Sequence, residues 1–210
     1  QDCWWVYYDI DVNASLGIFI LQQCICDAQY RKTVDDFFKE VAKNHITNVV
    51  IDLRDNGGGN SSVANYFIRY LDIDRYYDLP MDVRYGDFLL KYRETIDTNK
   101  RLQPQFTGQV YVLTNRRTFS AAKDFAMMIR DNDLGLIVGR ASSNLPDTYG
   151  DCLYFVLPNS HMNLSVSYKR WFRIDCSKSG QPLTPDIECN SYQALEKVYE
   201  LIYQPEIWIY

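Results

Sequence analysis

Residues 48–62 carry the feature that most constrains the fold: an apolar run, a charged turn and three consecutive glycines. Val49, Val50 and Ile51 are β-branched residues flanked by polar ones, a pattern typical of a buried strand in a parallel or mixed sheet. Gly57–Gly59 allows backbone angles that other residues avoid, and its N–H groups have no side chain in front of them. A strand that ends in such amides at the start of a helix is suited to hold a phosphate, a carboxylate or an oxyanion.

A helix is expected directly after the glycines. Asn60, Ser61 or Ser62 can cap its first turn, because short polar side chains accept hydrogen bonds from the free N–H groups there. The residues that share one face of this helix are Val63, Tyr66, Phe67, Tyr70 and Leu71.

The same strand, turn and helix order appears again later in the chain. Further strands are predicted at residues 4–8, 16–21, 110–114, 136–138, 152–157 and 164–168, and further helices at 33–45, 120–132 and 195–202. Residues 72–106 are expected to form an excursion with a strand or short helices around 81–92, and residues 140–151 a polar loop. In each of these units a short turn, which we call an elbow, joins a strand to the helix that follows it. Repeated strand–elbow–helix units with inserted hairpins predict an α/β sandwich built on a mixed sheet.

Composition narrows the class of protein. The 210 residues, 47% of them hydrophobic, are enough for one domain, residues 1–210, with a substantial core. The net charge of −5 and the lack of a basic stripe argue against a nucleic-acid partner. No apolar run approaches the ~20 residues of a membrane span. No signal peptide opens the chain, and its abrupt start at a strand predicts a fragment of a longer protein.

Cysteine and histidine positions argue against a metal site, and no cofactor is predicted. The two histidines are His45, expected at a helix end, and His161, expected in a hairpin turn. No pair of cysteines has C-x-x-C spacing, so free or partly paired thiols are expected. The cysteines are Cys3, Cys24, Cys26, Cys152, Cys176 and Cys189.

The glycine loop has three interpretations. A nucleotide site is disfavoured, because the chain lacks G-x-x-x-x-G-K-[ST] and the glycines do not have G-x-G-x-x-G spacing. A purely structural tight turn is the second interpretation. An oxyanion hole is the third, and it requires a nucleophile elsewhere. Ser120 is the candidate, since it stands at the head of a predicted helix where the amide of Ala121 can stabilise negative charge. A serine in this position can equally be a helix cap.

The two elbows together resemble a known family. Three segments occur in the order and spacing of the tail-specific, carboxy-terminal processing serine peptidases: Asp52–Gly59, Val112–Ala126 and Asp131–Gly139. Members of that family share the ClpP/crotonase-like fold. The resemblance extends from about Leu16 to Cys189, and Pro185–Ile187 is similar to the family's late strand. It implies an endopeptidase that cleaves polypeptides through an acyl-enzyme. Ser120 matches the nucleophile, and the amides of Ala121 and Gly58 match the oxyanion donors.

The chain departs from the family at the general base. Many members carry a lysine about twenty-five residues after the serine, and here Leu145 occupies that place. Ser120 and Lys123 have the S-x-x-K spacing that puts a lysine one helical turn from its serine, so Lys123 is a candidate base. A solvent-exposed lysine with no catalytic role is the alternative.

Three hypotheses about function follow. The first is a serine peptidase with an unconventional base, and the second is an inactive relative that binds peptides in the same groove. The third is an unrelated α/β protein whose glycine loop binds a phosphate ligand. The resemblance also implies an extracytoplasmic location, whether secreted or anchored through an upstream segment. Substrate preference and oligomeric state are not indicated by the sequence.

Overall fold

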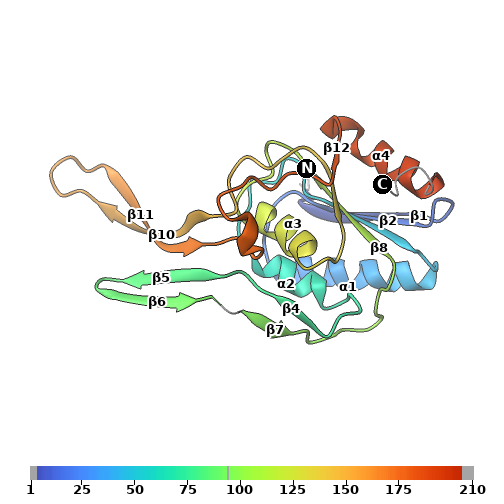
Figure 1. Cartoon of the computed structure of the whole chain (residues 1–210), viewed down its shortest axis with the longest axis horizontal. Coiled ribbons are helices and arrows are strands. Elements are labelled where there is room, and N and C mark those ends of the chain that lie inside the picture. Colours follow the sequence, from blue (N-terminus) through green and yellow to red (C-terminus); the bar gives the residue numbers. More distant parts are fainter. Residues whose placement is uncertain (1–3, 94, 205–210) are drawn as a thin grey trace.

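The computed structural model describes residues 4–93 and 95–204. Its centre is a six-stranded sheet with the order β1-β2-β3-β8-β9-β12 (Figure 1). β1 is antiparallel to β2, whereas the later neighbours pair in parallel. The strands are β1 (Val6–Asp11), β2 (Leu16–Leu21), β3 (Asn48–Asp52), β8 (Gln109–Thr114), β9 (Leu136–Gly139) and β12 (Ile187–Glu188). The predicted α/β fold with a mixed sheet is confirmed.

Helices cover both faces of this central sheet. Successive side chains of a strand point to opposite faces, so a strand made of consecutive apolar residues has to be covered on both. In β3, Val49 and Ile51 pack into the core beneath the first three helices, whereas Val50 packs with Val198 and Leu201 of the last helix. Figure 1 shows α1 and α2 below the sheet and α4 above it. The helices are α1 (Ala28–Lys43), α2 (Ser62–Ile68), α3 (Ala121–Asp131) and α4 (Ala194–Tyr203), with 3₁₀ turns at Cys176–Lys178 and Ser191–Gln193.

Helix α1 begins earlier than the predicted start at Thr33. Its N-cap is Asp27, whose carboxylate accepts a hydrogen bond from Tyr30 N at 2.8 Å. Thr33 lies inside the helix and donates its hydroxyl to Gln29 O. The end of the helix agrees with the prediction, since Asn44 is the C-cap and His45 follows it with a φ of 53°.

A second, antiparallel sheet of order β10-β11-β5-β6 extends from the body, and we call it the projecting sheet. Figure 1 shows its two hairpins reaching to the left of the central sheet. Its strands are β5 (Met81–Tyr85), β6 (Phe88–Tyr92), β10 (Thr148–Val156) and β11 (Asn163–Trp171), and a separate pair is formed by β4 (Arg75–Tyr77) and β7 (Ile96–Thr98).

The strands outside the central sheet bear on two predictions. Of the alternatives for residues 81–92, a strand or short helices, the strand is confirmed, and the described residues of 72–106 contain four short strands and no helix. The predicted loop at 140–151 is wrong at its end, which belongs to β10. Strands of the projecting sheet expose large apolar residues such as Phe88 and Tyr154, so the contrast between a buried and a solvated face is weak in their sequence. The predicted hairpin around His161 is confirmed, and His161 is exposed in its turn.

Five cysteines lie in the described part of the chain and all are free thiols. Cys3 lies outside the described residues. Within residues 4–93 and 95–204, no helix is both long and apolar enough to cross a membrane.

Candidate active site

The glycine loop after β3 is held by a buried asparagine that sequence reasoning did not single out. Asn56 is fully buried, donates Nδ2–H to Leu21 O at 2.8 Å and accepts the Gly58 amide on Oδ1 at 2.8 Å. On the other side of the loop, Cys24 N donates to Gly58 O and Asn60 N donates to Cys24 O. The loop is therefore fixed before any ligand binds, and the amide of Gly58 already has a partner in Asn56.

Ser120 occupies the second elbow, at the junction between β8 and α3. Its backbone has a φ of 52°, in the left-handed region that non-glycine residues seldom adopt and that often marks functional sites. Ser120 stands at the N-cap of α3 but makes no side-chain cap hydrogen bond, so the capping interpretation is not supported. Its amide donates to Asn144 Oδ1 at 3.1 Å, which ties the elbow to the loop before β10.

The structure brings the two elbows into direct contact. Phe119 N donates to Asn56 O at 2.9 Å, and Thr118 Oγ1 donates to Leu53 O at 2.8 Å. A Cβ placed on Gly58 would stand 2.7 Å from Ser120 Cβ and 2.9 Å from the Ala121 amide nitrogen. Only glycine fits here without displacing the serine elbow, so the predicted pairing of residue 58 with Ser120 holds in space.

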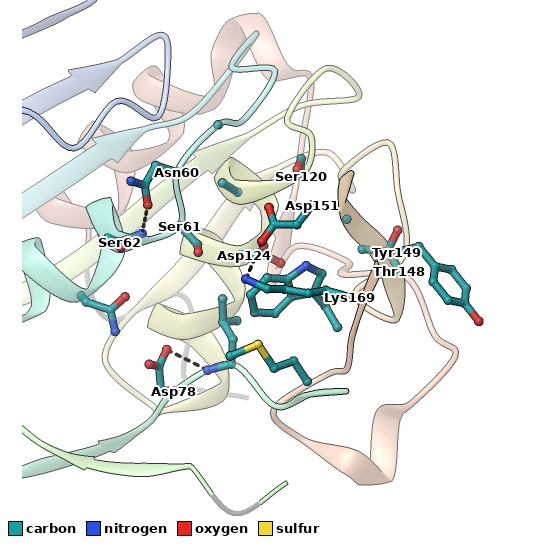
Figure 2. A pocket seen from close by; sticks show the side chains of 17 residues that line it. Asn60, Ser61, Ser62, Asp78, Ser120, Asp124, Thr148, Tyr149, Asp151 and Lys169 are labelled. Atoms are coloured by element: carbon teal, nitrogen blue, oxygen red, sulfur yellow. Dashed lines mark hydrogen bonds and ion pairs between the residues drawn. The ribbon is translucent and has the colours of Figure 1, made fainter. Parts of the chain in front are cut away.

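A cavity of about 570 Å³ opens beside Ser120. Figure 2 shows that its walls come from the glycine loop, α3, the segment around Asp78 and the projecting sheet. Of the predicted site residues, Ser120 and Ala121 line the cavity. The other lining residues include Gly59, Asn60, Ser61, Ser62, Asp124, Asp151, Lys169 and Trp171.

The amide of Ala121 is free to bind a ligand, since it has no hydrogen-bond acceptor among the described residues. Two of the amides that follow it already have acceptors, since Ala122 N donates to Phe119 O and Asp124 N to Ser120 O. A free amide in the first turn of a helix, next to a serine hydroxyl, is a suitable donor to an oxyanion.

Lys123 is buried and paired, so the expectation of a solvent-exposed lysine is wrong. Its side chain is 0% exposed and forms an ion pair with Asp124. Its Nζ also donates to Pro146 O at 3.2 Å. Burial raises the pKa of Asp124, and the charge of Lys123 offsets only part of that effect. Lys123 is not among the residues that line the cavity, although Asp124 is.

The position of the family's lysine and the two histidines do not bring a titratable group to the cavity, as the sequence indicated. Leu145 is 43% exposed in the loop next to Asn144. His45 lies at the end of α1 and His161 in the turn of the β10–β11 hairpin, as expected from the sequence. The cavity instead contains an ion pair between Asp151 and Lys169, which sequence reasoning missed.

Cys24 lies close to the glycine loop but is not a nucleophile at neutral pH. Its side chain is buried and donates Sγ–H to Asn56 Oδ1 at 3.6 Å. Burial raises the pKa of the Cys24 thiol to about 12, with a smaller opposing effect from the hydrogen bond to Asn56. The thiol therefore stays protonated, and Ser120 is the nucleophile candidate of this cavity.

A strained serine at a helix start, packed against a glycine loop inside an α/β fold, is the arrangement found in serine hydrolases. The family model of peptidase family S41 matches residues 16–189. The chain therefore belongs to peptidase family S41, as the resemblance implied.

Solved structures share the fold. The chain resembles the photosystem II D1 C-terminal processing protease with a TM-score of 0.62 and 20% identity, over 89% of this chain and 46% of that one. Mature CPAF gives a TM-score of 0.65 and 14% identity, over 90% of this chain and 51% of that one. A lipoprotein from Streptococcus agalactiae gives a TM-score of 0.65 and 13% identity, over 96% of this chain and 70% of that one. The chain thus spans about half the length of the first two proteins.

Proposed function

We propose that this chain carries the catalytic centre of a serine endopeptidase, which cleaves polypeptides through an acyl-enzyme on Ser120. The observation that carries the proposal is the close contact between the Ser120 elbow and the glycine loop. A Cβ added to Gly58 would lie only 2.7 Å from Ser120 Cβ. Membership of peptidase family S41 supports the reaction class. The cavity of about 570 Å³ beside Ser120 is the place where this proposal puts the scissile carbonyl of the substrate.

The oxyanion donors in this proposal are the amides of Ala121 and Gly58. The Ala121 amide is unoccupied in the described structure, whereas the Gly58 amide donates to Asn56 Oδ1 at 2.8 Å. A substrate oxygen must therefore share the Gly58 amide with Asn56 or replace it. Each such donor is worth on the order of 10²–10³ in rate.

The role of Lys123 as a base, suggested by the S-x-x-K spacing, is less well supported. Its ammonium group is already bound by Asp124 and by the carbonyl of Pro146. To reach the Ser120 hydroxyl as a base, Lys123 would have to give up its contacts with Asp124 and Pro146. A base among the residues that line the cavity fits the proposed reaction better than Lys123.

A fluorophosphonate probe tests the nucleophile, because it reacts with activated serine hydroxyls. We expect labelling of the wild-type protein and none of Ser120→Ala. Ser61→Ala and Ser62→Ala are matched controls, since both serines line the same cavity, and they should keep the label. Equal labelling of Ser120→Ala would contradict the proposal.

The alternative function is an inactive relative that binds polypeptides in the same cavity. The exposed Leu145 at the family's lysine position favours this alternative. In that case the fluorophosphonate leaves the wild type unlabelled, while a polypeptide substrate still binds and raises the melting temperature. The third hypothesis, a phosphate ligand at the glycine loop, has no support beyond the free amide of Ala121.

We further propose that residues 1–210 form a single domain within a longer protein located outside the cytoplasm. The similarity to a lipoprotein supports the location. The proposal of a longer protein is supported by the solved structures, of which this chain covers only 46% and 51%.

A further inference from the structure

The Asp151–Lys169 ion pair lies in the same cavity as Ser120, and the proposed function leaves it unexplained. Asp151 belongs to β10 and Lys169 to β11, and Asp151 Oδ2 is 2.5 Å from Lys169 Nζ. Figure 2 shows the two side chains pointing toward one another in the part of the pocket that contains Ser120 and Asp124. The Lys169 side chain is 22% exposed and that of Asp151 is 47% exposed, so the carboxylate is open to the cavity.

The backbone of β10 is distorted at the residue that makes this pair. Gly150 stands opposite Lys169 in the sheet register, and Cys152 opposite Ser167. In a regular strand, the side chain of residue 151 would therefore point to the face opposite Lys169. Asp151 instead has a φ of 50°, in the left-handed region, and contacts Lys169. Residues with a Cβ seldom adopt this conformation, and here it accompanies a carboxylate in the cavity.

The residue before Asp151 is also fitted to this arrangement. A Cβ on Gly150 would lie 2.9 Å from Trp171 Nε1, so the glycine lets the indole pack against β10. Trp171 lines the cavity, and Lys169 Nζ stands 5.3 Å from the centre of its ring. The lysine is thus held between an aromatic face and a carboxylate. Burial works to lower the pKa of Lys169, but the contact with Asp151 outweighs it and holds that pKa above its ordinary value.

Among the described residues, three carboxylates line the cavity, and Figure 2 shows Asp151 on the side of Ser120 and Asp78 on the opposite side. Asp124 is already neutralised by Lys123, and Asp78 accepts the amide of Leu79 on Oδ1. Asp151 uses Oδ2 for Lys169, and its Oδ1 has no partner among the described residues. The other titratable groups that line the cavity or act on Lys169 are Asp78, Tyr85, Asp124 and Tyr168, while the Tyr149 ring points away from the cavity in Figure 2.

We propose that Asp151 is the general base for Ser120 and that Lys169 is its positioning residue, in place of the lysine missing at Leu145. This inference rests on the proposed function. As Ser120 Oγ bonds to the substrate carbonyl carbon, its proton passes to Asp151 Oδ1. When the scissile C–N bond breaks, the leaving nitrogen takes that proton. In deacylation a water gives its proton to Asp151 while attacking the acyl carbon, and the proton then returns to Ser120. Lys169 stays an ammonium ion throughout.

The pH dependence of fluorophosphonate labelling separates a carboxylate base from a lysine base. A carboxylate base carries no proton that must be removed in alkali, so the labelling rate should stay level from neutral into alkaline pH. A lysine with a raised pKa loses its proton only in alkali, so its rate would climb steadily above neutral pH. A rate that climbs in this way would overturn the proposal.

Variants supply the second test. Asp151→Asn keeps a residue that tolerates the left-handed conformation but cannot accept the proton, and its labelling rate should fall by about 10² or more. Lys169→Met should lower the rate less, and Lys169→Arg, which keeps a cation beside Asp151, should retain most of the wild-type rate. Asp74→Asn is the control, because Asp74 is exposed and forms an ion pair with Arg101 at 2.8 Å. Neither of these two residues lines the cavity. Melting temperatures verify that each variant is folded.

The outcomes distinguish this inference from the proposed function. Loss of labelling in Ser120→Ala with a wild-type rate and profile in Asp151→Asn leaves Ser120 as the nucleophile and refutes Asp151 as the base. Labelling that persists in Ser120→Ala refutes both.

Discussion

Replacement of Gly58 by alanine tests the contact on which the proposed site depends. Gly58 has a φ of 95°, and a Cβ there would lie 2.7 Å from Phe119 O, 2.7 Å from Ser120 Cβ and 2.9 Å from Ala121 N. Two of these neighbours are backbone atoms, which cannot rotate away as the end of a side chain can. Gly58→Ala must therefore push the serine elbow away from the glycine loop.

The expected destabilisation has two parts. A non-glycine residue in this conformation costs about 1–3 kcal/mol. Overpacking against a fixed neighbour adds about 1–3 kcal/mol. The sum is about 2–6 kcal/mol, a large fraction of the stability of an ordinary domain.

Two other glycines separate these parts. Gly86 has a φ of 59° and an added Cβ would meet nothing within 4 Å, so Gly86→Ala should show the conformational part alone. Gly57 also has open space around an added Cβ and no positive φ, so Gly57→Ala should be close to neutral.

The assay combines urea unfolding with the rate of fluorophosphonate labelling at Ser120. The free energy of unfolding should fall least for Gly57→Ala, more for Gly86→Ala and most for Gly58→Ala. Only Gly58→Ala should also slow labelling, since the other two glycines do not contact the elbow. A Gly58→Ala protein with the stability and labelling rate of Gly57→Ala would refute the packing described here.

Two further predictions concern charged groups around the site. Lys123→Met should destabilise the protein by about 3–5 kcal/mol in urea unfolding, because it leaves the Asp124 carboxylate buried without its cation. The double variant with Asp124→Leu should recover much of that loss, and failure to recover it would contradict the buried pair. For Asp147, burial works to raise the pKa, but the amides of Gly180 and Arg173 outweigh it and hold the pKa below the ordinary 3.8. The Asp147 carboxylate therefore stabilises the folded state fully above about pH 3.8, the ordinary pKa. This contribution is lost as the pH falls through the lower pKa that Asp147 has in the folded state. Unfolding at a series of pH values should show a weaker acid dependence in Asp147→Asn, and an unchanged dependence would contradict this assignment.

The central strands β2, β3 and β8 were predictable because they are buried on both faces. Such strands appear as short apolar runs, and the runs at 16–21 and 110–114 fall within one residue of β2 and β8. The helices of the central body were equally clear in their periodicity. The start of α1 was misplaced because its true cap, Asp27, lies six residues before Thr33, and both residue types can cap a helix.

The projecting sheet was only partly predictable. The β10–β11 hairpin was expected, but the strands between residues 72 and 106 were not resolved from the sequence. Leu89 and Leu90 of β6 are both exposed, so no alternation of apolar and polar residues marks that strand. Pairing of β5 with β11 fixes these strands, and this long-range contact leaves no local signal.

The candidate site divides in the same way. The juxtaposition of Ser120 with the glycine loop followed from two local motifs, each a strand, a turn and a helix. The burial of Lys123 depends on the loop carbonyl of Pro146, and the position of Asp151 depends on a left-handed residue in a strand. Neither property has a pattern that can be read from neighbouring residues.

The most direct test of the central claim is acid-quenched mass spectrometry during turnover of an unstructured polypeptide or an activated peptide ester. We predict an acyl adduct on the peptide that contains Ser120, formed before product release, and no adduct or cleavage with Ser120→Ala. Cleavage that persists in Ser120→Ala, or an adduct located on another residue, would contradict the assignment of Ser120 as the nucleophile.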